Sequence, residues 1–182
     1  MANKVFEKSF FAGFGGQGII LMGQVWVYFA IREGRNGTFF PFYGAEKRGG
    51  IARASVIISD DEIDSPLVVT PDSVVVMNID SFPLCEGIIK SGGLMLINST
   101  LVKDEPKRTD IKAVKIEATA IAEKLGDVRA ANMVALGALA KATGAIALSD
   151  SEGAIRRFFP TAKSNVIDLN VEAIKAGFDS VK

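Results

Sequence analysis

The sequence predicts an α/β fold with a doubly wound, mainly parallel sheet and helices on both faces. Segments typical of strands alternate with helical segments along the 182 residues. Two of them, Ser73–Asn78 and Leu94–Asn98, are continuous apolar runs, which are typical of parallel strands buried on both faces. A glycine-rich turn, Gly13–Gly18, joins the first predicted strand to the first predicted helix, as in Rossmann-like domains.

Each element follows from a local pattern. Strands are predicted where β-branched and aromatic residues cluster between turn signals: 6–12, 36–40, 51–59, 73–78, 94–98 and 112–116. Helices are predicted where a segment begins at a capping residue such as serine or ends at a glycine: 16–33, 82–90, 118–125, 131–142, 149–158 and 164–176. Gly34, Gly126 and Gly144 are placed to end three of the helices. We find no repeat or linker, so 1–182 is predicted to be one domain, with the motifs in about 5–145 and a C-terminal helical part in about 146–182.

Composition excludes several classes of protein. Lys and Arg total 21 and Asp and Glu total 21, which argues against a nucleic-acid-binding protein. One cysteine, Cys85, excludes a disulfide framework and a chain-borne iron–sulfur cluster. The absence of histidine removes Ser-His-Asp and Cys-His catalysis. We predict no catalytic residue and no metal site. The apolar stretch Ile19–Ile31 is too short to cross a bilayer, so no membrane span is predicted. The single cysteine, and the glycines that interrupt any signal-peptide core, favour a cytoplasmic location.

The glycine turn is the first candidate site. Gly13, Gly15 and Gly18 satisfy G-x-G-x-x-G, with Gly16 as an additional glycine, in the strand-to-helix context where such a turn binds an anion. The dinucleotide interpretation also requires an acid near the end of the second strand, but Thr38–Pro41 supplies none. Three interpretations stay open: a phosphate or another subunit's group meets the turn, the glycines serve only close packing, or the turn binds a free dinucleotide.

A second glycine-rich loop, Pro41–Gly50, carries the other candidate residues. Arg48 has the geometry to hold a phosphate or carboxylate, Glu46 to orient it, and Tyr43 to stack on a ring. The simplest alternative is a solvated loop with an Arg–Glu pair. In a doubly wound sheet this loop is expected to lie beside the Gly13–Gly18 turn.

Together these motifs resemble a known family. In order, GFGGQGIILMGQ, TFFPFYGAEKRGG, DSPLVVTPDSVVVMN, GGLMLINS and RAANMVALGALAKATG are similar to the gamma subunit of 2-oxoacid:ferredoxin oxidoreductases, nearest the 2-oxoglutarate and branched-chain branch. The resemblance covers about residues 8–160. The sequence departs from many relatives at Ala45, Lys47 and Ile51, so a hydroxyl contact from position 51 is in doubt.

The resemblance implies a complex that decarboxylates a 2-oxoacid with thiamine diphosphate and Mg, passes electrons through iron–sulfur clusters to ferredoxin, and forms an acyl-CoA. It implies alpha, beta and delta partner chains that hold those cofactors. The gamma chain is then a structural subunit near the coenzyme A path, binding no cofactor alone, with the two glycine loops contacting coenzyme A or a partner subunit. The alternative is a self-sufficient nucleotide-binding α/β oxidoreductase that uses the Gly13–Gly18 turn.

The helix around Ile19–Ile31 leaves almost no polar face, which predicts burial on two sides. We expect the second cover to be another subunit, and the isolated chain to form a homodimer through this helix; the alternative is burial under the C-terminal helices. Asn78 and Asn98 end central strands and are interpreted as capping or turn residues, with a crevice role as the alternative. Asn132 is interpreted as a cap, the acids 60–64 as a solvated turn, and Cys85 as inert core.

Overall fold

The computed structural model describes residues 4–42 and 50–182. Its elements are one α/β domain with a six-stranded, mostly parallel sheet, as predicted. The strands are β1 (Phe6–Phe14), β2 (Asn36–Phe42), β3 (Ile51–Ser59), β4 (Ser73–Val76), β5 (Leu94–Asn98) and β6 (Lys112–Ile116). The helices are α1 (Ile19–Arg32), α2 (Phe82–Ile88), α3 (Ala118–Lys124), α4 (Ala131–Thr143), α5 (Ser151–Phe158) and α6 (Ser164–Ser180), with 3-10 turns at Ile79–Ser81 and Val128–Ala130.

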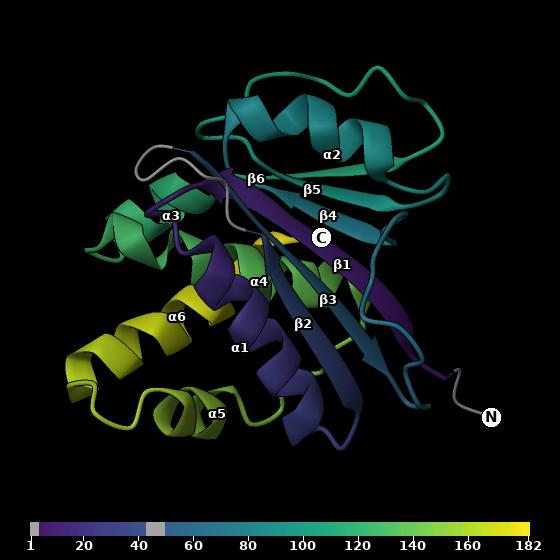
Figure 1. Cartoon of the computed structure of the whole chain (residues 1–182). Coiled ribbons are helices and arrows are strands. Elements are labelled where there is room, and N and C mark those ends of the chain that lie inside the picture. Colours follow the sequence, from purple (N-terminus) through teal and green to yellow (C-terminus); the bar gives the residue numbers. More distant parts are fainter. Residues whose placement is uncertain (1–3, 43–49) are drawn as a thin grey trace.

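The strand order is β2-β3-β1-β4-β5-β6 (Figure 1). Strands β1, β4, β5 and β6 are parallel, whereas β3 runs antiparallel between β1 and β2. A doubly wound sheet in its simplest form places the second strand beside the first. Here β3 lies between β1 and β2 and pairs with both along its whole length. Ser55 of β3, for example, is opposite Phe10 of β1 on one side and Phe40 of β2 on the other. Pro41, which has no N–H to donate, lies in β2 at the edge of the sheet, where such a residue is tolerated.

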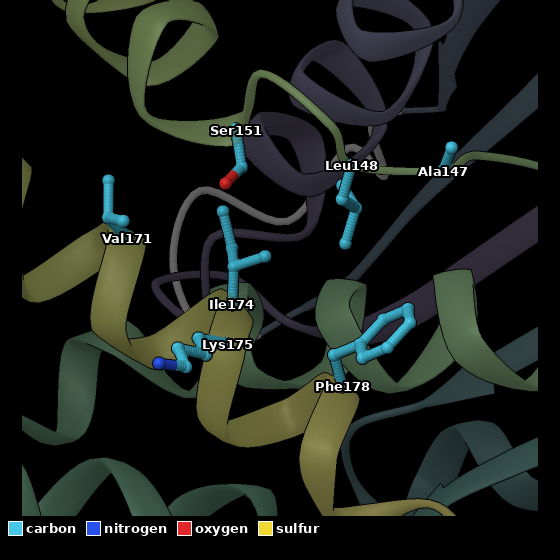
Figure 2. A pocket seen from close by; sticks show the side chains of 7 residues that line it. All are labelled: Ala147, Leu148, Ser151, Val171, Ile174, Lys175 and Phe178. Atoms are coloured by element: carbon cyan, nitrogen blue, oxygen red, sulfur yellow. The ribbon is translucent and has the colours of Figure 1, made fainter.

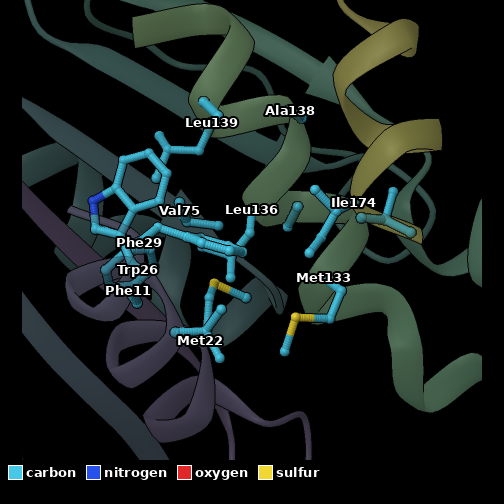
Figure 3. Close-up of a cluster of buried hydrophobic side chains, with 14 of the residues drawn as sticks. Phe11, Met22, Trp26, Phe29, Val75, Met133, Leu136, Ala138, Leu139 and Ile174 are labelled. Carbon is cyan, nitrogen blue, oxygen red and sulfur yellow. The ribbon is translucent and has the colours of Figure 1, made fainter. Parts of the chain in front are cut away.

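Helices lie on both faces of the sheet, but unequally (Figure 1). The larger core joins one face to α1, α3, α4, α5 and α6. Figure 3 shows its centre, where Trp26 and Phe29 of α1 meet Leu136 and Leu139 of α4. The smaller core joins α2 to the opposite face of β1, β4 and β5. We call the first the five-helix face and the second the α2 face.

Helix α1 is covered by the chain itself, which corrects the expectation that another subunit covers it. Trp26 is fully buried and its Nε1 donates to Ser9 Oγ at 3.1 Å. Tyr28 meets Phe158 of α5 edge-on, with ring centroids 5.4 Å apart. The apolar pattern of α1 is therefore explained by the sheet on one side and by α4 and α5 on the other. The predicted homodimer can therefore no longer be argued from α1, and it stays an untested prediction.

The helix buried all round is α4, in which every residue from Ala131 to Ala140 is buried. Its contact with α6 is made backbone to backbone. A Cβ added at Gly137 would lie 1.8 Å from the Ile174 carbonyl oxygen, and one added at Gly177 would lie 1.8 Å from the Val134 carbonyl oxygen. Glycine at these two positions lets the two helices approach so closely.

Candidate functional site

The glycine turn lies at the carboxyl end of β1, with Gly18 as the N-cap of α1. Gly16 and Gly18 have φ values of 100° and 72°, in the left-handed region that favours glycine. Gly13 is packed from within, since an added Cβ would lie 2.7 Å from Ile19 Cδ1 and 2.9 Å from Met77 Cβ. Gly16 has no atom within 4 Å of the same position. Gly16 and Gly18 are therefore required for the conformation of the turn, and Gly13 for its close packing. The space beside Gly16 is open.

Gln17 holds the turn in shape. Its Oε1 accepts from the Phe14 N–H at 2.7 Å, and its Nε2 donates to the Met77 carbonyl at 3.1 Å. The backbone N–H of Gln17 donates to the Phe14 carbonyl at 3.1 Å. One side chain thus ties the turn to itself and to the end of β4. Its position inside G-x-G-x-x-G was the only sequence signal for this role.

The turn has backbone N–H groups left for a ligand. The Gly15 N–H is used, because it donates to the Gly50 carbonyl at 3.0 Å. The N–H groups of Gly16 and Gly18 have no acceptor among the residues that the structure describes. The first turn of α1 adds N–H groups without intrahelical partners, and no acidic side chain stands there. This arrangement favours an anion.

The wall opposite the turn is formed by the start of α4. Asn132 is buried, and its Nδ2 donates to the Gly18 carbonyl at 3.3 Å, while its Oδ1 accepts from the Met133 N–H. An added Cβ at Gly18 would lie 2.3 Å from Asn132 Nδ2. The predicted capping role of Asn132 is wrong, because the N-cap of α4 is Ala130 and no side chain caps this helix. Asn132 lies one residue inside the helix and fastens α4 to the glycine turn instead.

A crevice of about 150 Å³ opens between these parts. The residues that line it come from the turn, the end of β4, the loop after β5, and the region from α3 to α4: Gly16, Gln17, Met77, Leu101, Thr119, Val128, Arg129 and Ala131. The Arg129 guanidinium donates to both carboxylate oxygens of Asp127, Nε to Oδ1 at 3.0 Å and Nη2 to Oδ2 at 2.6 Å, and these bonds lower the pKa of Asp127. The Arg129 side chain is 86% exposed, so it can swing toward an anion in the crevice. Sequence reasoning missed Leu101, Thr119 and Val128 because they come from the turn after β5, from helix α3 and from a 3-10 turn, which lie apart in the chain.

Asn78 and Asn98, the two asparagines that follow or end central strands, lie on different sides of the sheet. Asn98 Nδ2 donates to Thr119 Oγ1 at 2.9 Å, and Asn98 Oδ1 accepts from the Thr119 N–H, so Asn98 joins β5 to α3 behind the crevice. Asn78 follows Met77, which lines the crevice, and strand alternation places it on the α2 face instead. Both polar atoms of the Asn78 amide are buried without a partner in the described part of the chain.

The other sequence candidates are placed as follows. Tyr43, Glu46 and Arg48 lie outside the described residues, although the following Gly50 meets Gly15 of the turn. Asp60 and Asp61 are engaged by Arg35 and Lys4. Cys85 is core, as predicted, and burial raises the pKa of its thiol to about 12.

A larger cleft, of about 210 Å³, lies between α6 and the start of α5 (Figure 2). Its lining is apolar apart from Ser151 and Lys175. Such a lining offers little to orient a ligand. Within residues 4–42 and 50–182 no group of three metal-ligating side chains comes together, and no helix is long and apolar enough to cross a membrane.

Comparison with known proteins gives one consistent family. The family model described as "Pyruvate ferredoxin/flavodoxin oxidoreductase" matches residues 8–180. The 2-oxoglutarate synthase subunit KorC of Methanothermobacter marburgensis is 37% identical over 173 residues, covering 91% of both chains. The ketoisovalerate oxidoreductase subunit VorA of the same organism is 38% identical over 170 residues, covering 92% of this chain but 35% of VorA. The chain thus spans about a third of the length of VorA.

Solved structures agree. The gamma subunit of a keto/oxoacid ferredoxin oxidoreductase from Geobacter sulfurreducens has a TM-score of 0.79 at 28% identity, covering 95% of this chain and 96% of that one. The 2-oxoglutarate:ferredoxin oxidoreductase of Magnetococcus marinus, solved with 2-oxoglutarate, coenzyme A and succinyl-CoA bound, has a TM-score of 0.85 at 25% identity. That match covers 99% of this chain and 32% of the longer one.

Proposed function

Because the chain belongs to the pyruvate ferredoxin/flavodoxin oxidoreductase family, as a protein of its gamma-subunit type, we propose that it works inside a complex that oxidises a 2-oxoacid to an acyl-CoA and reduces ferredoxin. The named relatives act on 2-oxoglutarate, ketoisovalerate and pyruvate. We place this complex with the 2-oxoglutarate enzymes, because KorC is 37% identical over 91% of both chains, whereas the common gamma subunit of the pyruvate/ketoisovalerate oxidoreductases of Thermococcus kodakarensis, aligned over a similar share, is 32% identical.

Partner alpha, beta and delta subunits supply the chemistry in this proposal. Thiamine diphosphate, Mg and the iron–sulfur clusters belong to those chains, because this sequence has no histidine and its one cysteine is buried. The isolated chain is therefore expected to reduce no viologen dye with a 2-oxoacid and coenzyme A. Activity is expected only after the partner subunits are added.

The crevice at the glycine turn is the part of this chain that fits coenzyme A. Its phosphates would meet the N–H groups of Gly16 and Gly18 and the start of α1, with Arg129 at the rim and Arg48 on the second glycine loop. The observation that carries this assignment is the open space at Gly16 beside those N–H groups. Coenzyme A supplies the thiol that accepts the acyl group, and this chain only positions its phosphates.

A self-sufficient dinucleotide-binding domain is disfavoured by the topology. Such domains read the ribose with an acid at the end of the strand beside the glycine turn. Here β3 separates β2 from β1, so the end of β2 lies two strands away from the turn. Titrating the isolated chain with NAD, FAD and coenzyme A compares the two functions directly, and tight NAD or FAD binding would favour the dinucleotide function.

Steady-state kinetics of the reconstituted complex test the coenzyme A site. Arg129→Ala and Arg48→Ala are each expected to raise the KM for coenzyme A about tenfold, since a charge-assisted contact is worth about 1.5–3 kcal/mol. The KM for the 2-oxoacid should stay unchanged. Arg156→Ala, on α5, is the matched control at an exposed arginine. Loss of assembly in Arg48→Ala would make the second loop a subunit contact instead.

A further inference from the structure

The wall of the crevice contains a hydroxyl group that is held in place from behind. Thr119, the second residue of α3, lines the crevice. Asn98, at the end of β5, holds Thr119 by two hydrogen bonds: the Thr119 N–H donates to Asn98 Oδ1 at 3.3 Å, and Asn98 Nδ2 donates to Thr119 Oγ1 at 2.9 Å. Asn98 is 1% exposed and Thr119 is 7% exposed. The pair is therefore a fixed part of the crevice wall.

These two bonds determine where the hydroxyl proton of Thr119 points. A backbone N–H can only donate, so the Thr119 N–H requires the oxygen of the Asn98 amide on its side. The amide nitrogen must then face Thr119 Oγ1, which accepts from it. A hydroxyl that accepts from an N–H group turns its own proton elsewhere, and within residues 4–42 and 50–182 that proton has no acceptor. Thr119 thus offers the crevice one oriented and unused donor.

The other side chains of the crevice lining are either engaged or apolar. Gln17 bonds to the glycine turn through both ends of its amide, and Arg129 bonds to Asp127. Leu101 and Val128 present apolar surface, at 46% and 49% exposure. Apolar walls with one placed polar group are typical of a small-molecule site, where the polar group fixes the orientation. The crevice volume of about 150 Å³ suits a flat ring, since a dry cavity of about that size holds benzene.

Coenzyme A has two ends, and the division of labour in the complex decides which end stays in this crevice. In the proposed function the thiol reaches a thiamine diphosphate that partner subunits hold, so the pantetheine arm leads away from this chain. The phosphates meet the N–H groups of Gly16 and Gly18, and Gly16 itself lines the crevice. On the other side of the phosphates comes adenosine. Its adenine ring is flat, and the ring nitrogens N3 and N7 accept hydrogen bonds.

We propose that the crevice holds the adenine ring of coenzyme A, that the Thr119 hydroxyl donates to a nitrogen of that ring, and that Asn98 positions the hydroxyl. This inference rests on the proposed function and deepens it, because that function assigns only the phosphates to this chain. Thr119 is then a specificity-determining residue that recognises the nucleotide end. Asn98 is a positioning residue, since it acts through Thr119.

The test uses the reconstituted complex with two thiol substrates, coenzyme A and phosphopantetheine, which lacks the adenosine. Thr119→Val keeps the shape of the side chain and removes the donor. It is expected to raise the KM for coenzyme A about fivefold, while kcat, the KM for the 2-oxoacid and the kcat/KM for phosphopantetheine stay unchanged. Thr100→Val is the matched control and should leave all four unchanged. Thr100 Oγ1 also holds α3, because it accepts from the Ala120 N–H at 3.2 Å, but Thr100 is not part of the crevice lining.

Asn98→Asp tests the positioning role. An aspartate accepts both from the Thr119 N–H and from the Thr119 hydroxyl, so it turns the hydroxyl proton away from the crevice while Thr119 itself remains. We expect this variant to reproduce the rise in the KM for coenzyme A, again without a change for phosphopantetheine. A purely structural role of Asn98 would instead change the kinetics with both thiols.

A measurement on the wild-type complex covers the case in which a variant does not fold. Adenosine 3′,5′-bisphosphate, the nucleotide end of coenzyme A, should inhibit the complex competitively with coenzyme A. Absence of that inhibition, an unchanged KM for coenzyme A in Thr119→Val, or an equal effect on phosphopantetheine overturns the adenine assignment and leaves the proposed function standing. A wild-type complex that shows no coenzyme A-dependent oxidation of a 2-oxoacid refutes the proposed function itself.

Discussion

The two sides of the sheet use the same strands but are covered differently. On the five-helix face, Phe11, Val56 and Val75 enter a core that continues through α1 and α4 to α6. On the α2 face, one seven-residue helix covers the central strands and leaves Phe40 and Phe42 at the surface. The first face therefore contributes most of the buried apolar surface that stabilises the domain.

Replacing aromatic residues on the two faces should give the largest contrast. Trp26→Ala removes a fully buried side chain and its bond to Ser9, and is expected to lower the free energy of unfolding by about 3–5 kcal/mol. Phe40→Ala, at a residue that lies on the α2 face and is 40% exposed, should change the free energy of unfolding by less than about 1 kcal/mol. Urea unfolding of the isolated chain measures both. Equal losses would contradict the division between the faces.

Glycine substitutions sharpen the comparison of the helices. Gly137→Val forces α4 away from α6, so we expect a loss of about 3 kcal/mol or more in the free energy of unfolding. Gly87→Ala in α2 is the control, because an added Cβ there meets nothing within 4 Å. It should stabilise the chain by about 0.5–1 kcal/mol through helix propensity. A harmless Gly137→Val would show that α6 is held elsewhere.

Glu7, on the five-helix face of β1, should make the free energy of unfolding depend on pH. Burial raises the pKa of this carboxyl from 4.5 to about 7, and the nearby Asp72 adds to the rise. Between these two values the folded chain binds more protons than the unfolded chain, so the free energy of unfolding falls as pH rises from about 4.5 to about 7. Glu7→Gln should flatten this slope and leave the chain more stable at pH 8 by up to about 3 kcal/mol. Denaturation curves at pH 5 and 8 test it, and an unchanged slope in Glu7→Gln would assign the effect to another group.

The smallest expected effect is the reactivity of Cys85, on the buried side of α2, the helix that covers the α2 face. Cys85 is fully buried and its thiol pKa is raised to about 12, so alkylation by iodoacetamide at pH 8 should be negligible in the folded chain. Unfolding in urea should expose it to complete labelling. Rapid labelling of the folded chain, followed by mass spectrometry, would mean that α2 opens readily.

Sequence patterns predicted the strands and helices well because each depends on local composition, as in the apolar runs of β4 and β5. They did not predict that β3 lies between β1 and β2, since alternation in Ile51–Ser59 says which side chains share a face but not which strand pairs with it. The cover of α1 was wrongly assigned to another subunit for the same reason: an apolar helix shows that it is covered, not by what.

The candidate site was predictable where one motif carries it. The left-handed conformation of Gly18 follows from the G-x-G-x-x-G spacing, whereas Gly16 is an additional glycine that the motif does not require. The crevice wall formed by Leu101 and Val128 does not follow from that spacing, because loops distant in sequence meet there only after the sheet has formed. The roles of Tyr43, Glu46 and Arg48 stay predictions.

The close contact of Gly137 with α6 also bears on how the chain folds during synthesis. Helix α4 lies under α6, and α6 leaves the ribosome after α4 and after all six strands. Until residues 164–180 have emerged, the outer side of α4 has nothing to pack against, although the sheet strands are already available. A ribosome that pauses before Ser164 therefore holds a nascent chain with an exposed, alanine-rich helix, which is the surface that chaperones bind and that aggregation begins from.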